Sequence, residues 1–252
     1  MGRFAGRVVF VTGAGSGVGR ATAALFAEEG ARVFGIDVNR DGISETVATI
    51  KKAGGEADGM HCDVASFEEV GRAVQRTVEV YGGLNVLVNA AGIGGFKRFE
   101  ELEPEEWQRT LAVNVTGMFN TIKAALPHLL RPPVGNVVNV GSTSSLRGTA
   151  YAAHYAASKA AVLNLTRSLA LEFASRDLRV NCVAPGGVRT PLGRFFMRRE
   201  DFEQHLVDYS APPKRGHFAE PIDIARVIAF LASDDARMVN GVALLADGGT
   251  LA

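Results

Sequence analysis

The chain has 252 residues, 47% of them hydrophobic, which suffices to bury one large core and lies near the size at which single cores stop growing. Its 27 Lys and Arg residues balance 27 Asp and Glu residues, so no net charge would draw it to nucleic acid or to an anionic membrane surface. These values favour a single domain over residues 1–252 and a small, neutral partner molecule.

The cysteines and the hydropathy exclude further classes of protein. Cys62 and Cys182 have neither the number nor the spacing of a disulfide framework or a zinc site, which suits a reducing compartment. His61 beside Cys62 on a strand would point to the opposite face, so the two cannot chelate one ion, and we predict no metal site. No apolar run approaches the roughly 18 residues of a membrane span. We therefore expect a cytoplasmic protein with no membrane partner.

Taken in chain order, short β-branched runs bounded by turn residues alternate with stretches of helical period. This alternation is typical of parallel strands joined by crossover helices. It predicts a doubly wound α/β fold of the Rossmann type, with a seven-stranded parallel sheet flanked by helices. The expected strands are residues 7–12, 32–37, 57–62, 84–89, 135–140, 179–184 and 242–246.

The helix signals between these strands are local. Residues 21–29 carry an apolar face and stop at Gly30, a residue suited to the left-handed end of a helix. Ser66 with Glu69 predicts a capping box, and the helix that follows should end near Gly82. Residues 187–216 break the pattern, and such long insertions often carry binding loops, so we expect a substrate loop there.

The first strand empties into a glycine-rich loop at 12–19, and a helix follows at once. Glycine lets the backbone turn tightly near a pyrophosphate, while the free N–H groups of the new helix stabilise its charge. The spacing differs from the ordinary G-x-G-x-x-G pattern. The loop nevertheless predicts a dinucleotide site, and the residues expected to touch the cofactor are Gly13, Ser16, Gly17, Val18 and Gly19.

Asp37, at the end of the second strand, indicates which dinucleotide is bound. Its carboxylate would accept hydrogen bonds from ribose hydroxyls. It would also repel the additional phosphate of NADP by roughly 4 kcal/mol per unit charge at close range. Arg40 nearby weakens this preference, because a rotated guanidinium would meet a phosphate. We expect NAD as the cofactor, with NADP the less favoured choice.

Tyr155 and Lys159 lie four residues apart at the start of a helical run and therefore share one helix face. A free phenol is only about 0.1% ionised at neutral pH, so it needs a cation to act as a base. One unit charge at about 5 Å would lower its pKa by about two units. Alone, the spacing equally describes a surface Tyr-Lys pair on an amphipathic helix.

Ser142 lies just beyond the fifth expected strand, at the edge where open α/β sheets bind ligands. Its hydroxyl would hold the oxygen of a substrate. Thr143, Ser144 and Ser145 are neighbouring candidates, and we choose Ser142 for its position relative to the strand and to Tyr155.

Together these motifs resemble the short-chain dehydrogenase/reductase family over essentially the whole chain. The matching elements are the 12–19 loop, Asp63-Val64, Asn89-Ala90-Ala91-Gly92, Asn114, Ser142, Tyr155 with Lys159, Pro185-Gly186 with Thr190, and Asp247-Gly248-Gly249. One departure is Ala90, where an Asn is common, and another is Gly141 before Ser142, where a second Ser is frequent.

The resemblance implies catalytic roles. Tyr155 would be the general acid/base, and Lys159 would lower its pKa while binding the nicotinamide ribose. Ser142 would orient the substrate oxygen, and Asn114 would keep a water-linked proton relay to bulk solvent. Adenine would be held by Asp63 and Val64. The remaining implied cofactor contacts are Val38, Asn89, Ala90, Gly92, Pro185, Gly186, Val188 and Thr190, the last with Val188 at the carboxamide.

These residues predict an NAD-dependent oxidoreductase that transfers a hydride between nicotinamide and a secondary alcohol or its ketone. One alternative is an NADPH-dependent reductase similar to 3-oxoacyl-(acyl carrier protein) reductases, and another is a catalytically silent dinucleotide-binding protein. The sequence does not specify the alcohol, the direction of reaction or the stereochemistry. It also leaves open whether His154, Arg194, Arg198 or Arg199 touches the substrate.

The oligomeric state is predicted partly from the resemblance and partly from helix patterning. The segments 104–130 and 151–175 carry apolar residues over more than one face, which is more than one sheet can cover. Pairing such helices with symmetry mates would bury the remainder. We expect a homotetramer.

Overall fold

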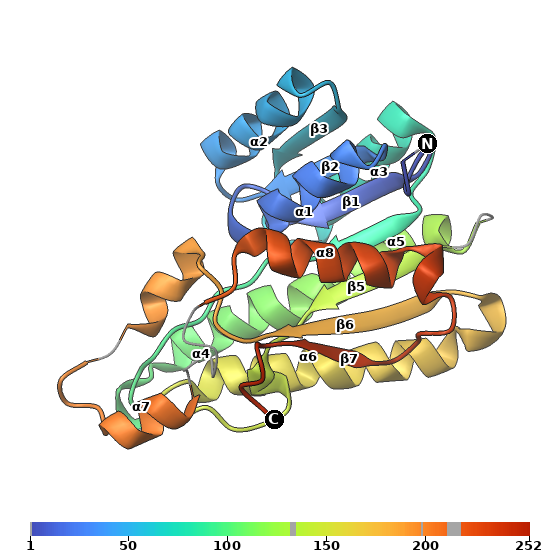
Figure 1. Cartoon of the computed structure of the whole chain (residues 1–252). Helices are drawn as coiled ribbons and strands as arrows, with labels where there is room; N and C mark the ends of the chain where they lie inside the picture. Colours follow the sequence, from blue (N-terminus) through green and yellow to red (C-terminus); the bar gives the residue numbers. More distant parts are fainter. Residues whose placement is uncertain (1, 132–134, 198, 211–217) are drawn as a thin grey trace.

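The seven predicted strands form one sheet in the computed structural model of the chain, which describes residues 2–131, 135–197, 199–210 and 218–252. All neighbouring strands are parallel, in the order β3-β2-β1-β4-β5-β6-β7 (Figure 1). The strands are β1 Val8–Thr12, β2 Arg32–Asp37, β3 Glu56–His61, β4 Val86–Asn89, β5 Asn136–Val140, β6 Arg179–Pro185 and β7 Ala243–Ala246. The predicted doubly wound α/β fold is confirmed.

The largest departure from the expected strand bounds lies at the start of β4, which begins at Val86 rather than at residue 84. The reason is a side chain. The backbone N–H of Val8 donates to the side-chain Oδ1 of Asn85 (2.9 Å) instead of to a backbone carbonyl. The regular pairing of β1 with β4 therefore starts only at Val9 and Val86.

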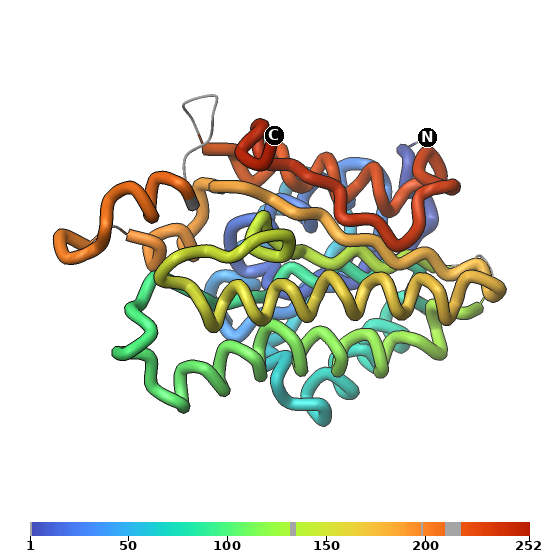
Figure 2. Tube along the Cα trace, turned by 90° about the horizontal axis from the view of Figure 1, so that it is seen from below, coloured from blue at the N-terminus to red at the C-terminus, as the bar shows by residue number. Residues whose placement is uncertain are grey.

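Helices cover both faces of the sheet. One face carries α1 Gly17–Glu28, α2 Arg40–Lys52 and α8 Pro221–Ala232, whose buried side chains belong to one core cluster. The other carries α3 Phe67–Tyr81, α4 Pro104–Leu111, α5 Gly117–Leu129 and α6 Ala153–Glu172. Figure 2 views the molecule from below, with α6 running across it. Short turns of 3-10 helix lie at Phe99–Glu101, Thr143–Ser145 (η3), Ala174–Arg176, Pro191–Phe196 (η5) and Asp234–Ala236.

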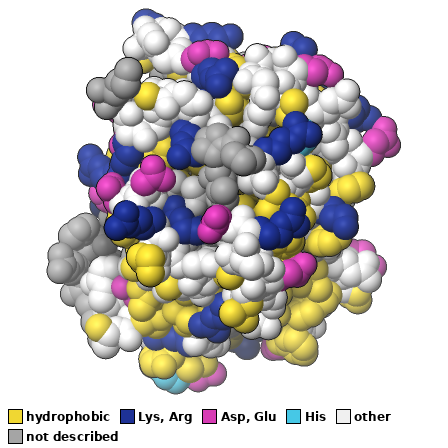
Figure 3. All heavy atoms as spheres, turned by 90° about the vertical axis from the view of Figure 1, so that its right-hand side faces the viewer, with side chains coloured by type: hydrophobic (Ala, Val, Ile, Leu, Met, Phe, Trp, Pro, Cys, Tyr) yellow, Lys and Arg dark blue, Asp and Glu magenta, His cyan; other side chains and the backbone are white. Residues whose placement is uncertain are grey.

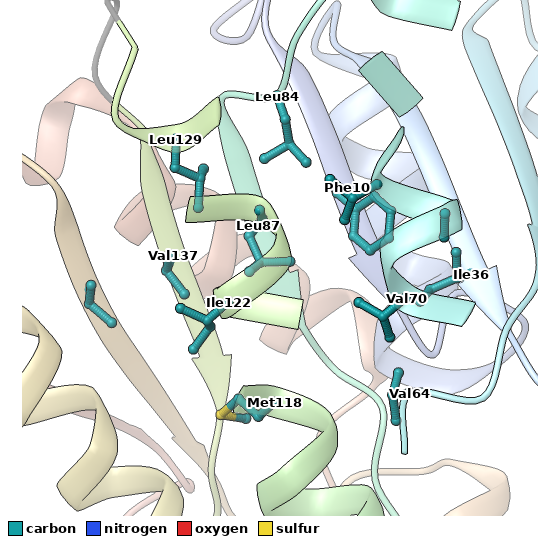
Figure 4. Close-up of a cluster of buried hydrophobic side chains, with 14 of the residues drawn as sticks. Phe10, Ile36, Val64, Val70, Leu84, Leu87, Met118, Ile122, Leu129 and Val137 are labelled. Carbon is teal, nitrogen blue, oxygen red and sulfur yellow. The ribbon is translucent and has the colours of Figure 1, made fainter. Parts of the chain in front are cut away.

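Each central strand feeds both cores because successive side chains point to opposite faces. Val8 and Phe10 of β1 belong to the cluster beneath α3, α5 and α6, whereas Val9 and Val11 belong to the cluster beneath α1 and α8. Figure 4 shows the first cluster, in which Phe10 lies among side chains from neighbouring strands and helices. Strands buried on both faces read as continuous apolar runs, which is why the sequence signal for them is strong.

The helix ends follow the predicted signals with one correction. Gly30 and Gly82 have positive φ angles of 92° and 81°, as expected for residues that end helices in the left-handed conformation. Ser66 caps α3 by accepting from the N–H of Glu69. The predicted reciprocal half of the capping box was wrong, because the Glu69 carboxylate instead accepts from the N–H of Asp63 (3.0 Å) and ties down the turn before the helix.

The expected helix over 104–130 is continuous but not uniform. A π turn at Ala112–Thr116 separates α4 from α5, and Asn114 lies inside it. Such a turn widens the helix locally and often marks a functional site. No residue pattern in the sequence announced it.

The order of the strands indicates where on the sheet a ligand would bind. The connections from β1 and from β4 run to opposite sides of the sheet, so a crevice opens between these two neighbouring strands at their carboxyl ends. The predicted insertion at 187–216 lies beyond the same end of the sheet, where η5 and α7 (Gln204–Ser210) project (Figure 1). Residues 198 and 211–216 of that insertion lie outside the described residues.

Candidate active site

A cavity of about 680 Å³ lies at the carboxyl ends of the strands. Its volume is in the range of known small-molecule and cofactor sites. The structure brings almost all the predicted site residues to its wall: Gly13, Ser16, Gly17, Val18, Gly19, Asp37, Val38, Asp63, Val64, Ala90, Gly92, Ser142, Tyr155, Lys159, Pro185, Gly186, Val188 and Thr190. Asn89 and Asn114 are not among its lining residues.

The N-terminus of α1 forms one part of the wall and suits an anion. Ser16 is its N-cap and makes no side-chain capping bond, and the first turn holds no acidic residue. The free N–H groups and the helix dipole therefore face the cavity without a competing carboxylate. Gly13 and Gly17 hold the loop open in positive-φ conformations of 67° and 52°. A pyrophosphate fits this environment.

Asp37 is fixed in place by the same loop. One carboxylate oxygen accepts from the N–H of Gly15 (2.9 Å), and the other accepts from the N–H of Asn39 (2.8 Å). Each oxygen keeps a further lone pair for a ligand hydroxyl. The carboxylate at the cavity wall thus fits a ribose diol and disfavours an added phosphate.

Asp63 and Val64 lie on the neighbouring wall, as expected for the adenine end. The Asp63 carboxylate accepts from the guanidinium of Arg109 (3.1 Å) and from the N–H of Ala65 (2.9 Å). Arg109 also lines the cavity, on α4, and was not predicted. This end therefore combines a carboxylate, a guanidinium and apolar surface.

The side chain of Asn89 lies in a buried hydrogen-bond network beneath the cavity wall. Its Nδ2 donates to Oδ1 of Asn139 (2.9 Å), and its Oδ1 accepts from the hydroxyl of Thr121 (2.6 Å). Asn139 in turn donates to Thr166 on α6 (2.9 Å). This buried chain joins β4, β5, α5 and α6, so the side chain supports the site from below while the following residues, Ala90 to Gly92, form the wall.

Asn114 is held by the π turn next to the catalytic helix. Its Oδ1 accepts from the N–H of Ile93 (2.9 Å), and its Nδ2 donates to the carbonyl of Ile93 (2.8 Å) and to the hydroxyl of Ser158 (2.9 Å). The same Ser158 hydroxyl donates to the carbonyl of Tyr155 (2.7 Å). Asn114 thus connects the loop after β4 to α6, directly behind the cavity wall.

Tyr155 is buried at the centre of the wall. Burial raises the pKa of its phenol, and a hydrogen bond with Ser142 lowers that pKa in part. The ring meets Phe196 edge-on, with centroids 5.0 Å apart. Gly94 also packs against the ring, since a Cβ there would lie 2.3 Å from it. Neither Phe196 nor Gly94 was predicted to touch Tyr155. Gly94 is one of several glycines after β4, a pattern that is visible in the sequence, whereas no pattern marks Phe196.

Lys159 lies one helical turn from Tyr155, with Nζ 5.6 Å from the ring centroid. Its ammonium donates to the carbonyl of Val140 (2.8 Å), and burial lowers its pKa to about 8. The predicted proximity of cation and phenol is therefore present. The expected lowering of the Tyr155 pKa by Lys159 does not appear, because burial raises this pKa and the group that opposes the rise is Ser142.

Ser142 caps η3 at the end of β5. Its hydroxyl oxygen accepts from the N–H of Ser144 (3.1 Å), and its own N–H donates to Oγ of Ser145 (3.1 Å). With one lone pair engaged, the Ser142 hydroxyl hydrogen is free to point at Tyr155 or at a substrate oxygen. Thr143 and Ser144 also line the cavity, and Ser145 is not among the lining residues.

The sequence left open whether four basic side chains touch the substrate, and the structure places three of them away from the cavity. The Arg199 guanidinium is paired with Glu101 (2.7 Å) and Asp201 (2.9 Å). Arg194 is exposed and does not line the cavity, and His154 is buried on α6 without lining it. Arg198 lies outside the described residues.

Metal and membrane features were searched over the same parts of the chain. Among the described residues, no group of three or more His, Cys, Asp or Glu side chains is arranged to hold a metal ion. Within those ranges, no helix has the length and apolar character needed to cross a membrane.

Comparison with known proteins gives one consistent result. Residues 13–250 match a family model described as enoyl-(acyl carrier protein) reductase. The chain is 40% identical to the 2,5-dichloro-2,5-cyclohexadiene-1,4-diol dehydrogenase of Sphingobium indicum, over 98% of this chain and 97% of that protein. It is 35% identical to the 3-oxoacyl-(acyl-carrier-protein) reductase of Thermotoga maritima, over 98% of both chains.

A solved structure extends the likeness to three dimensions. A short chain dehydrogenase from Mycobacterium paratuberculosis, bound to NAD, superimposes with a TM-score of 0.94 at 31% identity, covering 99% of both chains. The similarity therefore extends over the whole fold.

The buried charge of Lys159 should lower the free energy of unfolding of the protein. Its pKa falls from 10.5 to about 8 on folding, so the charged form carries an energetic cost below pH 8 that vanishes as pH rises beyond 10.5. Each pKa unit corresponds to about 1.4 kcal/mol, which makes the cost on the order of 3 kcal/mol. Lys159→Met should gain stability relative to the native chain at pH 7 and lose that gain by about pH 11, as measured by urea unfolding without cofactor.

Lys123→Met, at an exposed position on α5, controls for the loss of one charge. A stability difference for Lys159→Met that stays constant between the two pH values would contradict a desolvated ammonium at this position.

Proposed function

This chain belongs to the short-chain dehydrogenase/reductase family, and from that premise we propose that it is an NAD-dependent oxidoreductase acting on a secondary alcohol or its ketone. The observation that carries the proposal is the meeting of Ser142, Tyr155 and Lys159 on one cavity wall, with the Asp37 carboxylate at the far end. We further propose that residues 1–252 act as one dinucleotide-binding unit in which the 187–216 insertion borders the substrate.

The cavity wall fits a dinucleotide. Its pyrophosphate would lie at the N-terminus of α1, its adenosine between Asp37 and Asp63, and its nicotinamide near Lys159 and Thr190. When bound, NAD supplies the ring carbon that takes up or returns a hydride. All other steps are tasks for side chains of this chain.

In alcohol oxidation, Tyr155 as phenolate accepts the hydroxyl proton of the substrate, and in ketone reduction the phenol gives that proton to the developing alkoxide. Ser142 donates a hydrogen bond that holds the substrate oxygen near the phenol. The ammonium of Lys159 stabilises the phenolate. Asn114, through Ser158, keeps the backbone of Tyr155 fixed.

A second candidate function is reduction of acyl groups on an acidic carrier protein, favoured by the likeness to the Thermotoga maritima enzyme. An enzyme of this kind that depends on NADPH would need a binding site for the additional phosphate and a basic surface on which the acidic carrier protein docks. The carboxylate of Asp37 at the ribose end and the balanced charge of the chain count against it. A silent binding protein would not need Ser142, Tyr155 and Lys159 together.

Exposed apolar side chains support an oligomeric assembly, and unpaired cysteines support a reducing location. Phe119 on α5 and Leu171 on α6 are 51% and 81% exposed, and Met238 is 90% exposed. Figure 3 shows hydrophobic side chains gathered toward the lower edge of the view, the level at which α6 runs in Figure 1. We propose that symmetry mates cover these side chains in a homotetramer. The unpaired thiols of Cys62 and Cys182 support a reducing, cytoplasmic setting.

Tyr155→Phe should lower the rate of alcohol oxidation by at least about 10²-fold and leave NAD binding nearly intact, because only the proton acceptor is lost. In the native enzyme, the raised pKa of Tyr155 means that oxidation, which needs the phenolate, should accelerate as pH rises above neutral, whereas ketone reduction, which needs the phenol, should stay nearly constant up to about pH 10. Initial rates between pH 6 and pH 10 measure both effects. Tyr81→Phe, a buried tyrosine outside the cavity, is the control, and retained turnover in Tyr155→Phe would refute the assignment.

Cofactor choice should depend on the charge of Asp37. Asp37→Asn keeps the size of the side chain, replaces one acceptor oxygen by an NH2 group and removes the repulsion of a phosphate, so the ratio of kcat/KM for NAD to that for NADP should fall by about tenfold or more. Asp41→Ala removes a carboxylate four residues away that does not line the cavity and should leave the ratio unchanged. A native preference for NADPH would overturn the electrostatic basis of this prediction.

Light scattering at micromolar concentration should give about four times the mass of one chain. Leu171→Glu, which places a charge on the exposed face of α6, should reduce that mass, because a desolvated carboxylate in an apolar contact is costly. A native mass of one chain that does not change on dilution would mean that the exposed apolar side chains serve another purpose.

A further inference from the structure

The end of the cavity beyond Tyr155 differs chemically from the end that suits the dinucleotide. Its wall includes the apolar side chains of Ile93, Phe96, Leu192, Phe196 and Val207. The charged side chains among the described lining residues are Asp37, Asp63, Arg109 and Lys159. The first three belong to the adenosine end, and Lys159 donates to the carbonyl of Val140. Among these described residues a substrate carboxylate or phosphate would find no partner, which favours a neutral substrate.

The apolar walls are held firmly. Phe96 meets Phe196 edge-on with centroids 5.2 Å apart, and Phe196 meets Tyr155 in the same way. Behind them, the ring of Phe202 stacks on Tyr151 at 4.1 Å. The ion pair of Arg199 with Glu101 secures the insertion to the loop after β4. A flat apolar body, such as a carbon ring, fits against rings fixed in this way.

A pair of hydroxyl groups interrupts this apolar end. The hydroxyls of Ser144 and Thr149 lie 2.7 Å apart, and both residues line the cavity. Two hydroxyls that share one hydrogen bond use one of their two hydrogens, so one O–H remains to donate and several lone pairs remain to accept. The pair can therefore bind either a hydroxyl or a carbonyl oxygen. The catalytic roles described above use neither of these residues.

The pair lies close to the reacting group. The N–H of Ser144 donates to the hydroxyl of Ser142 (3.1 Å), the side chain that holds the reacting oxygen. The second polar position is thus joined through one turn of η3 to the first. A substrate that engaged both would carry two oxygen atoms separated by a short carbon skeleton.

We propose that Ser144 and Thr149 form a subsite for a second oxygen of the substrate, and that the substrates are neutral diols, hydroxyketones or diones with a compact apolar skeleton. The subsite rests on the proposed function, since it describes the substrate of the same site. It accounts for a hydrogen-bonded hydroxyl pair beside the apolar side chains of this end of the cavity. The competing explanation is that the hydroxyl pair only braces the loop between β5 and α6.

The test compares cyclohexanol with the 1,2- and 1,4-cyclohexanediols in the native enzyme and in the double variant Ser144→Ala/Thr149→Val, with NAD. The native enzyme should prefer at least one diol to cyclohexanol. The double variant should lose about three- to tenfold in kcat/KM for that diol, the effect of one lost hydrogen bond, and should change by less than about twofold for cyclohexanol. Thr77→Val, which removes a buried hydroxyl from α3 outside the cavity, should alter neither substrate.

Each other outcome has a distinct meaning. Equal losses for diol and cyclohexanol in the double variant would overturn the subsite in favour of a bracing role, as would an unchanged ratio between the two substrates. Turnover of cyclohexanol without preference for any diol would refute the subsite and leave the proposed function standing. Absence of NADH formation from all alcohols, together with absence of NADH consumption with ketones, would refute the proposed function itself.

Discussion

The site is organised around one buried charge, the ammonium of Lys159. It lies inside the protein with the carbonyl of Val140 as its hydrogen-bond acceptor, and that bond ties α6 to the end of β5. The contact brings Tyr155, on the same helix, to the end of the strand that leads to Ser142. A buried cation is costly, as the lowering of its pKa to about 8 shows. The protein loses stability at this position because its proposed function needs a cation beside the Tyr155 phenol.

Support for this arrangement comes from polar side chains that never reach the cavity. Asn89 and Asn139 link the two central strands to the helices beneath them, and Asn114 links the loop after β4 to the catalytic helix. Buried polar networks of this kind are stable only when all members are satisfied, and when satisfied they specify one geometry. The catalytic wall is therefore held in place from behind, which leaves the front free for ligands.

The two ends of the cavity differ in polarity, as a site for a dinucleotide and a neutral substrate requires. The end formed by β1, β2 and α1 presents helix N–H groups and the carboxylate of Asp37, which suit a large polar ligand. The end formed by the insertion and by the loops after β4 and β5 presents rings and a hydroxyl pair. Within one fold, the strand order supplies the first end, whereas segments outside the sheet supply the second.

The sequence by itself determined the strands, the glycine loop and the spacing of Tyr155 and Lys159, because each depends on local periodicity, turn chemistry or neighbouring positions on one helix. Only the tertiary structure decided that Asn89 faces its strand neighbour, that Glu69 reaches Asp63, that Phe196 covers Tyr155 and that Arg199 pairs with Glu101. These contacts join residues from separate elements. Their partners are chosen by how strands and helices pack, and no local pattern records that choice.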